Sequence, residues 1–367
     1  MKPAKFLVVT EFGNPSGYRT IAEGIFERIV KQGHEVHVLG VNYTGDEHNY
    51  SFQLIPVQFA WVPQLVTRLI EIFKIDWVIF MMDAPKIIAV CNNIEKHRAT
   101  FFKETKTAAI FPVESDPFLV EWAESIKNFT ALRFTFTDAA VKTFSETGVK
   151  IFKLPVGLSN IWYNDTYHNV STGFTNFVIT VADNQIRKNL NSAFDIISRC
   201  PNLSYVVVTR AKSREGWDLE VLAKTYGIEN RVFIVDNKGV TRYQLKKLYS
   251  QAKVLLLPSL AEGIGLPLYE AQSQGCKVVA TNCCGIPEGV SDKRFLVDHE
   301  YKTVYPWGNT NHYWINREQA AQKLLEAMNE SREVIKFPTW DDAADKFLQK
   351  VDVFNSLNEA VTNVKKA

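Results

Sequence analysis

Two glutamates eight positions apart are the residues of this sequence best suited to chemistry. They lie in Leu257 to Gly275, LPSLAEGIGLPLYEAQSQG, where Glu262 falls in a turn and Glu270 on the helix expected after it. A carboxylate accepts hydrogen bonds from two adjacent hydroxyl groups, so each glutamate suits a sugar or a ribose. The free N–H groups of a first helical turn attract anions. The stretch therefore predicts a ligand with a sugar at one end, a ribose at the other and a diphosphate between them.

The elements around this stretch must position the two carboxylates. The run KVLLLPS (253–259) predicts a buried strand, and the turn follows at its carboxyl end, where open α/β sheets bind their ligands. Pro267 suits the first turn of a helix, and Gly275 suits its end. A purely structural interpretation makes Glu262 a capping charge and Glu270 a solvated helix residue. The two glutamates together with E-G-x-G-L-P favour a ligand site.

Two cations provide a second candidate site. Arg187 and Lys188 lie in TVADNQIRKNLNSAF (180–194), just after the first strand expected in the second half of the chain. Cations placed there would stabilise the charge that develops on a departing nucleoside diphosphate. Asn184 and Gln185 could add hydrogen bonds to it. The alternative is a helix with two exposed cations, but the position after a strand end favours a function.

The wider pattern predicts an α/β chain. Short apolar runs alternate with amphipathic stretches, which indicates βαβ units and parallel sheets covered on both faces. We expect a first domain over 1–165, a second over 166–337 and a helical segment over 338–367, with a linker in the polar stretch 159–176. The runs expected to be strands are 5–10, 34–41, 76–82, 107–113, 131–137 and 151–157 in the first half, and 176–182, 203–211, 230–236, 253–259 and 276–282 in the second.

Composition narrows the class of protein. The 367 residues carry a net charge of +2, which argues against a chain built mainly to coat nucleic acid. The five cysteines are odd in number and two are adjacent, so they indicate neither a disulfide framework nor a zinc site. The N-terminal MKPAKFLVVTEFG reads as a first strand rather than a signal peptide. We therefore expect a cytoplasmic protein with reduced thiols.

The sequence predicts no segment that crosses a membrane, but it allows peripheral contact with a membrane surface. No run of about 18 apolar residues predicts a membrane span. The apolar and aromatic segment 53–73, QLIPVQFAWVPQLVTRLIEIF, could be an interfacial helix, which would allow peripheral membrane contact. A helix that packs in the core or beside the acceptor is the favoured interpretation, because its polar face is thin.

The segment PSLAEGIGLPLYEAQSQGCKVVATNCCGIPEGV (258–290) resembles the E-x7-E signature of retaining GT-B glycosyltransferases of group 1, a family that uses nucleotide-activated sugars. The sequence is similar to bacterial, archaeal and phage members. The resemblance implies that Glu262 contacts the donor sugar and Glu270 the ribose of the nucleotide. It also implies that the backbone of four residues holds the distal phosphate and the sugar of the donor. These residues are Gly263, Ile264, Gly265 and Leu266.

The resemblance covers roughly the whole chain and is strongest from 180 to 290. The family carries an arginine and a lysine at the positions of Arg187 and Lys188, which implies that they neutralise the diphosphate. EFGNPSGYRTIAEGI resembles the family's glycine-rich first loop, with Ser16 and Gly17 in place of the usual Gly-Gly pair. The fold implied is GT-B, in which two Rossmann-like domains face each other across a cleft. We also expect the C-terminal helical segment to cross back to the first domain.

The acceptor side is less defined. Where the family often has a histidine, FMMDAP offers Asp83, a candidate contact of the acceptor or the transferred sugar, with helix capping as the alternative. Glu114 and Asp116 in FPVESDP are further acceptor-side candidates. The acceptor class stays open between a lipid, a glycan, a protein, a small molecule and a modified nucleobase. The basic run over 86–106 would help to bind DNA if the acceptor is a modified base in it. Such a run more commonly forms a solvated helix face.

Together with these features, the resemblance implies transfer of a hexose from a UDP-linked sugar, UDP-glucose or similar, to an acceptor hydroxyl with retention of configuration. No D-x-D motif is evident at a strand end, and cations can replace a divalent ion electrostatically, so we expect no metal and no cofactor besides the donor. The alternatives are a glycosyltransferase of phage type acting on a modified DNA base, a UDP-sugar epimerase or phosphorylase of the same fold, and a non-catalytic nucleotide-sugar binding module.

Overall fold

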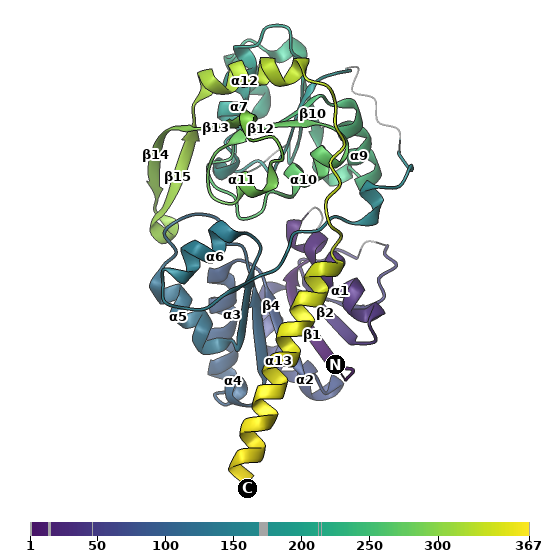
Figure 1. Cartoon of the computed structure of the whole chain (residues 1–367), viewed down its shortest axis with the longest axis vertical. Coiled ribbons are helices and arrows are strands. Elements are labelled where there is room, and N and C mark those ends of the chain that lie inside the picture. The colour runs from purple at the N-terminus through teal and green to yellow at the C-terminus, as the bar shows by residue number, and fades with distance from the viewer. Residues whose placement is uncertain are drawn as a thin grey trace.

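The computed structural model of the chain describes residues 2–13, 16–45, 47–168, 175–211, 213 and 215–366. Within them, two α/β domains follow each other along the long axis of the molecule (Figure 1). Asn14 and Pro15 of the predicted first loop and residues 169–174 of the predicted linker lie outside the described residues. The domain boundaries at 165/166 and 337/338 stay predictions.

The first domain holds a parallel sheet of seven strands in the order β3-β2-β1-β4-β5-β6-β7. Strands such as β4, WVIFM, are buried along their whole length, as expected for a sheet covered on both faces. The strands are β1 Lys5–Glu11, β2 Glu35–Val41, β3 Gln53–Val57, β4 Trp77–Met81, β5 Lys106–Ile110, β6 Leu132–Thr135 and β7 Phe152–Lys153. The helices are α1 Gly17–Lys31, α2 Val62–Phe73, α3 Ala84–His97, α4 Phe101–Glu104, α5 Val120–Phe129 and α6 Asp138–Ser145.

The second domain holds a parallel sheet of six strands in the order β10-β9-β8-β11-β12-β13. Its central strands β8 and β11 are neighbours, so the loops that follow them meet at one edge of the sheet. The strands are β8 Val178–Val181, β9 Tyr205–Thr209, β10 Val232–Asp236, β11 Val254–Leu257, β12 Lys277–Thr281 and β13 Leu296–Val297. The helices are α7 Leu190–Ser198, α8 Leu219–Thr225, α9 Arg242–Gln251, α10 Leu266–Ser273, α11 Ile286–Gly289 and α12 Arg317–Asn329.

Two segments differ from expectation. The single helix expected over 53–73 is wrong for its first residues, because Gln53–Val57 is strand β3 at the edge of the first sheet, where Pro56 is tolerated. The short helix η1 Phe59–Trp61 and then α2 follow it. An antiparallel hairpin of β14 His299–Tyr305 and β15 Thr310–Ile315 was not expected at all. All seven residues of β14 are exposed, so this strand lacks the apolar run by which the other strands are recognised.

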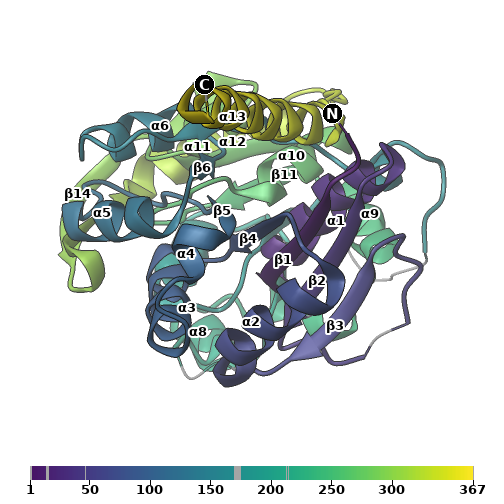
Figure 2. The same cartoon turned by 90° about the horizontal axis from the view of Figure 1, so that it is seen from below.

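The last helix, α13 Asp341–Lys366, returns to the first domain and lies along α1 (Figures 1 and 2). Trp340 is fully buried there, and a Cβ at Gly24 of α1 would lie 2.4 Å from its ring. The N–H of Leu158 donates to the carbonyl oxygen of Pro338 (2.9 Å), so the two chain segments that pass between the domains are paired. No helix among the described residues combines the length and apolarity that a membrane crossing requires.

Candidate active site

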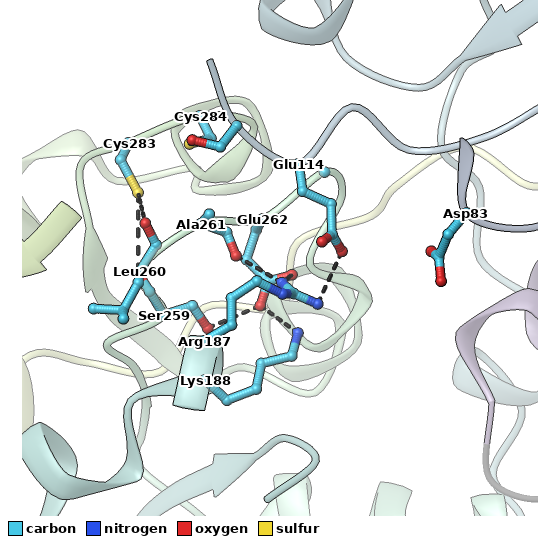
Figure 3. Close-up of polar contacts among 12 residues, drawn as sticks. Asp83, Glu114, Arg187, Lys188, Ser259, Leu260, Ala261, Glu262, Cys283 and Cys284 are labelled. Carbon is cyan, nitrogen blue, oxygen red and sulfur yellow. Dashed lines mark hydrogen bonds and ion pairs between the residues drawn. The ribbon is translucent and has the colours of Figure 1, made fainter. Parts of the chain in front are cut away.

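The loops after β8 and β11 bring a carboxylate and two cations into one cluster (Figure 3). Arg187 and Lys188 lie on the short helix η3 Ile186–Lys188 after β8, and Glu262 lies in the turn after β11. The Glu262 carboxylate accepts from Lys188 Nζ (2.5 Å) and Arg187 Nη1 (3.2 Å). It also accepts from the hydroxyl of Ser259 (2.8 Å). The sequence predicted the three charged residues, whereas Ser259 was missed.

The cluster is buried, and its charges depend on each other. Only 4% of Glu262 is exposed. Burial alone would raise the pKa of Glu262, but Lys188 and Arg187 outweigh it and lower that pKa to about 2. Burial and the nearby Arg187 lower the pKa of Lys188. Arg187 keeps a raised pKa in spite of burial, because Glu114 and Glu262 both face it. Glu262 is therefore ionised at neutral pH and a poor proton acceptor.

One asparagine fixes the turn that carries the two cations. Asn189 follows Lys188 in a left-handed conformation (φ 55°) and caps α7 by accepting from the N–H of Ser192 (3.4 Å). Its Nδ2 donates to the carbonyl oxygen of Pro258 (3.0 Å), which ties the turn to the end of β11. Asn189 was missed from the sequence, although an asparagine directly before an amphipathic run is a helix-start signal that could have identified it.

The start of α10 approaches the first domain closely. Gly265 has a φ of +69°, which a side chain would strain, and a Cβ at Gly263 would lie 2.6 Å from the Pro112 Cβ. A Cβ at Gly17, the first residue of α1, would lie 3.9 Å from Leu266 Cδ1. The N-termini of α1 and α10 therefore face each other across the domain boundary. Ile264 lies between the two glycines and is buried.

Glu270 lies on α10 in a different environment from Glu262. It is 8% exposed and accepts from the hydroxyl of Tyr249 (3.3 Å), another residue missed from the sequence. Burial raises the pKa of Glu270 to about 7, although Arg242 opposes the shift. Near neutral pH this carboxyl is thus divided between its neutral and ionised forms.

Two of the three acceptor-side candidates face the cluster. Glu114 Oε1 lies 2.8 Å from Arg187 Nη2, and Asp83 lies across from Glu114 (Figure 3). Asp83 precedes α3, but its side chain makes no capping hydrogen bond. Its carboxylate accepts instead from the hydroxyl of Tyr18 and pairs with Lys86 (3.0 Å). Tyr18, Asp83 and Glu114 therefore bring hydroxyl and carboxylate groups opposite the two cations.

The other two predicted site residues are engaged in structural contacts. The Asp116 carboxylate accepts from the hydroxyl of Tyr313 (2.5 Å) and from Nδ2 of Asn311 (3.3 Å), which joins the first domain to β15. Asn184 is fully buried, and its amide donates to and accepts from the backbone of Trp217 (2.8 and 2.9 Å). Both side chains thus hold loops in place in this conformation.

Metal ligands do not gather at this site. Among the described residues, no three His, Cys, Asp or Glu side chains come together as the ligands of a metal ion would. The cations that contact Glu262 are Arg187 and Lys188, and Lys86 pairs with Asp83.

The sequence of the second domain is similar to a known family. Residues 171–303 match the family described as glycosyl transferases group 1. The O-antigen chain mannosyltransferase B of Escherichia coli is 28% identical over 127 residues, which cover 34% of this chain and 33% of that protein. This chain therefore matches about a third of the length of that curated relative.

Solved structures resemble the chain over almost its whole length. Sucrose-phosphate synthase from Thermosynechococcus elongatus covers 97% of this chain and 100% of its own, with a TM-score of 0.66 and 14% identity. The Anabaena protein HepE, solved in complex with UDP-glucose, covers 98% of this chain and 100% of its own, with a TM-score of 0.66 and 15% identity. At this level of identity the likeness establishes the two-domain fold.

Proposed function

Since the chain carries a group 1 glycosyltransferase domain at residues 171–303 within a GT-B fold, we propose that it transfers a hexose from a nucleotide-linked sugar to an acceptor hydroxyl. The donor is UDP-glucose or a similar UDP-sugar, and the transfer retains configuration without a metal ion. The observation that carries this proposal is the buried cluster of Glu262, Arg187 and Lys188 at the adjoining ends of β8 and β11. We name these three residues the charge cluster.

The donor would lie across the charge cluster and the start of α10. Arg187 and Lys188 would bind the diphosphate and stabilise the charge that develops on the departing UDP. The first turn of α10, from Leu266, would add backbone N–H groups to the distal phosphate. Glu270 would accept the ribose hydroxyls, and Glu262 the hydroxyls of the sugar. The choice of UDP is supported by the solved complex of the similar Anabaena protein HepE with UDP-glucose.

The chemistry of transfer would not use Glu262 as a base. Its pKa of about 2 and its two cationic partners make it a weak proton acceptor at neutral pH. We propose a front-side attack in which the oxygen of the departing phosphate takes the proton of the acceptor hydroxyl, so that no protein base is required. Asp83 and Glu114 would orient that acceptor from the side of the first domain.

Turnover of a panel of UDP-sugars tests this proposal. We expect wild-type protein to bind UDP and to release UDP slowly from at least one UDP-sugar. Arg187→Ala should lower that release by about a hundredfold, because a charge that stabilises the leaving group is lost. Arg294→Ala is the matched control, since Arg294 lies in the same domain with 65% of its side chain exposed. Failure to bind UDP and every UDP-sugar would refute the proposal, and interconversion of free UDP-sugars would identify an epimerase instead.

A further inference from the structure

The hairpin of β14 and β15 places a row of aromatic rings beside the candidate active site. Tyr301 pairs with Trp314 across the hairpin, and their rings stack at 5.6 Å with 15° between their planes. Tyr305 stacks in the same way on His312, at 4.5 Å and 12°. Thr303 lies between the pairs and accepts from Nε1 of Trp314 (2.9 Å). We name these five residues the aromatic face.

Backbone hydrogen bonds hold strand β15 of the hairpin beside the charge cluster. The N–H of Tyr313 in β15 donates to the carbonyl oxygen of Leu260 (2.9 Å), two residues before Glu262. The carbonyl oxygen of Asn311 accepts from the hydroxyl of Ser115 (2.5 Å), the neighbour of Glu114. His312, the residue between Asn311 and Tyr313, therefore lies between the loop that carries Glu262 and the loop that carries Glu114.

That residue, His312, lies opposite Thr303 in the middle of the aromatic face. It is 5% exposed. Burial and the positive charge of Arg187 lower the pKa of His312 to about 4, which keeps its ring neutral at neutral pH. The face is open along β14, because 47% of Tyr301 and 40% of Tyr305 are exposed. The face thus borders the charge cluster at His312 and meets solvent along β14, and the hairpin lies beside α5 and α6 (Figures 1 and 2).

The opposite side of the hairpin is already in use. Tyr313 and Asn311 alternate with the residues of the aromatic face along β15 and bind Asp116 of the first domain. This contact orients the hairpin through the side opposite the aromatic face. The family match ends at residue 303, so most of the hairpin lies outside the matched domain.

The chemistry of the aromatic face suits one class of ligand. An aromatic ring offers a flat apolar surface with a weakly negative face, against which the C–H side of a sugar ring packs. Thr303 and His312 add polar groups for hydroxyls at the rim of that ring. At neutral pH none of the five side chains carries a charge, which suits a neutral ligand better than an anionic membrane surface.

Building on the proposed hexose transfer, we propose that the aromatic face binds a sugar unit of the acceptor, so that the acceptor is a glycan. The growing end would enter the cleft between Asp83 and the charge cluster. A preceding sugar unit would stack on Tyr301 or Tyr305. The enzyme would therefore require a glycan of more than one unit rather than a free monosaccharide.

Binding of oligosaccharides to the full-length chain loaded with UDP tests this inference. The probes are linear α-mannotetraose, maltotetraose and cellotetraose, measured by saturation-transfer NMR and by tryptophan fluorescence. We expect at least one tetrasaccharide to bind more tightly than its monosaccharide. Tyr301→Ala and Tyr305→Ala should each weaken that binding by about tenfold, as expected when one stacking ring is removed. Val304→Ala is the matched control, because Val304 is exposed on the opposite side of the same strand.

The outcomes separate this inference from the proposed function. UDP binding measured in each variant shows that the donor domain is folded, and its absence in wild-type protein would refute the transferase proposal itself. If UDP binds but no tetrasaccharide does, or if all variants bind the sugar equally, the glycan site is refuted. It is also refuted if the tyrosine substitutions abolish sedimentation with anionic phospholipid vesicles, or change the oligomeric state, while sugar binding is unchanged.

Discussion

Glu262 and Glu270 are the same kind of side chain, and their neighbours give them opposite acidities. Both are buried, which by itself raises the pKa of a carboxyl group. Glu262 has two cations within hydrogen-bonding distance, and its pKa is lowered to about 2. Glu270 accepts from the Tyr249 hydroxyl, and burial raises its pKa to about 7. In the proposed binding mode, Glu262 would hold the sugar as a fixed anion and Glu270 would respond to pH.

Replacing Glu262 tests its assignment to the sugar. Glu262→Gln removes the negative charge that Arg187 and Lys188 share, so both cations become more available to a diphosphate. We expect UDP to bind at least as tightly as to wild-type protein, while UDP release from the UDP-sugar falls by about a hundredfold. Calorimetry and a coupled UDP assay measure the two effects. Parallel losses of UDP binding and turnover would contradict the assignment, and Glu333→Gln, at an exposed position, is the control.

Glu270 should make nucleotide binding depend on pH. In the proposed binding mode the ribose hydroxyls donate to the ionised Glu270 carboxylate, so UDP should bind more tightly as the pH rises from about 6 to 8, through the pKa of about 7. The contribution of Glu270 to folding stability should change with pH in the opposite direction. Between the ordinary pKa of 4.5 and about 7, the folded state holds a proton that the unfolded state has released, so the stability contribution of this group falls as pH rises.

Glu270→Gln separates these effects from the titration of UDP itself. In this variant the part of the pH dependence due to Glu270 should disappear, both from the Kd for UDP and from the urea midpoint. Titrations between pH 5.5 and 8.5 in the wild type and the variant measure it. Identical pH profiles for the two proteins would show that Glu270 does not titrate in this range.

At the scale of elements, one glutamate joins α11 to α6 across the domain boundary. The Glu288 carboxylate accepts from the backbone N–H groups of Asp138 and Ala139 (2.9 Å each), the first two residues of α6. It also pairs with Lys153 (3.0 Å). A carboxylate at this place satisfies N–H groups that have no partner inside the helix.

Glu288→Ala should therefore loosen the contact between the domains. We expect a loss of about 1–2 kcal/mol in the free energy of unfolding, the usual cost of a lost helix cap. UDP should still bind, because the residues assigned to the donor keep their contacts. Urea unfolding and calorimetry measure the two quantities, with Glu333→Ala as control. A loss of UDP binding without a loss of stability would mean that Glu288 contacts the donor.

The sequence predicted those elements that have a local signal, such as a run of apolar residues. Long apolar runs located the central strands, and their carboxyl ends located Glu262 and Arg187. The exposed strand β14 and the proline-containing β3 gave no such signal. Side-chain partners from distant segments were equally invisible, as for Asn184, which is held by the backbone of Trp217. Such pairings depend on tertiary packing, which no local pattern records.

At the scale of the whole molecule, the two domains are held close to each other by several independent contacts. Arg187 binds Glu114, Asp116 binds β15, and α13 runs back along the first domain. Together they bring the predicted donor residues and the predicted acceptor residues to opposite walls of one site. In the proposed reaction, such proximity of the domains would exclude water, so that hydrolysis of the donor competes less with transfer.

The central claim is that this closed site moves a hexose from a UDP-sugar to an acceptor, and mass spectrometry tests it most directly. The protein is incubated with the UDP-sugar that it turns over and with the tetrasaccharide that it binds best. We predict a product heavier by one hexose, formed by wild-type protein and by Arg294→Ala but strongly reduced in Arg187→Ala. An unchanged acceptor with wild-type protein, or equal product with Arg187→Ala, would contradict the account.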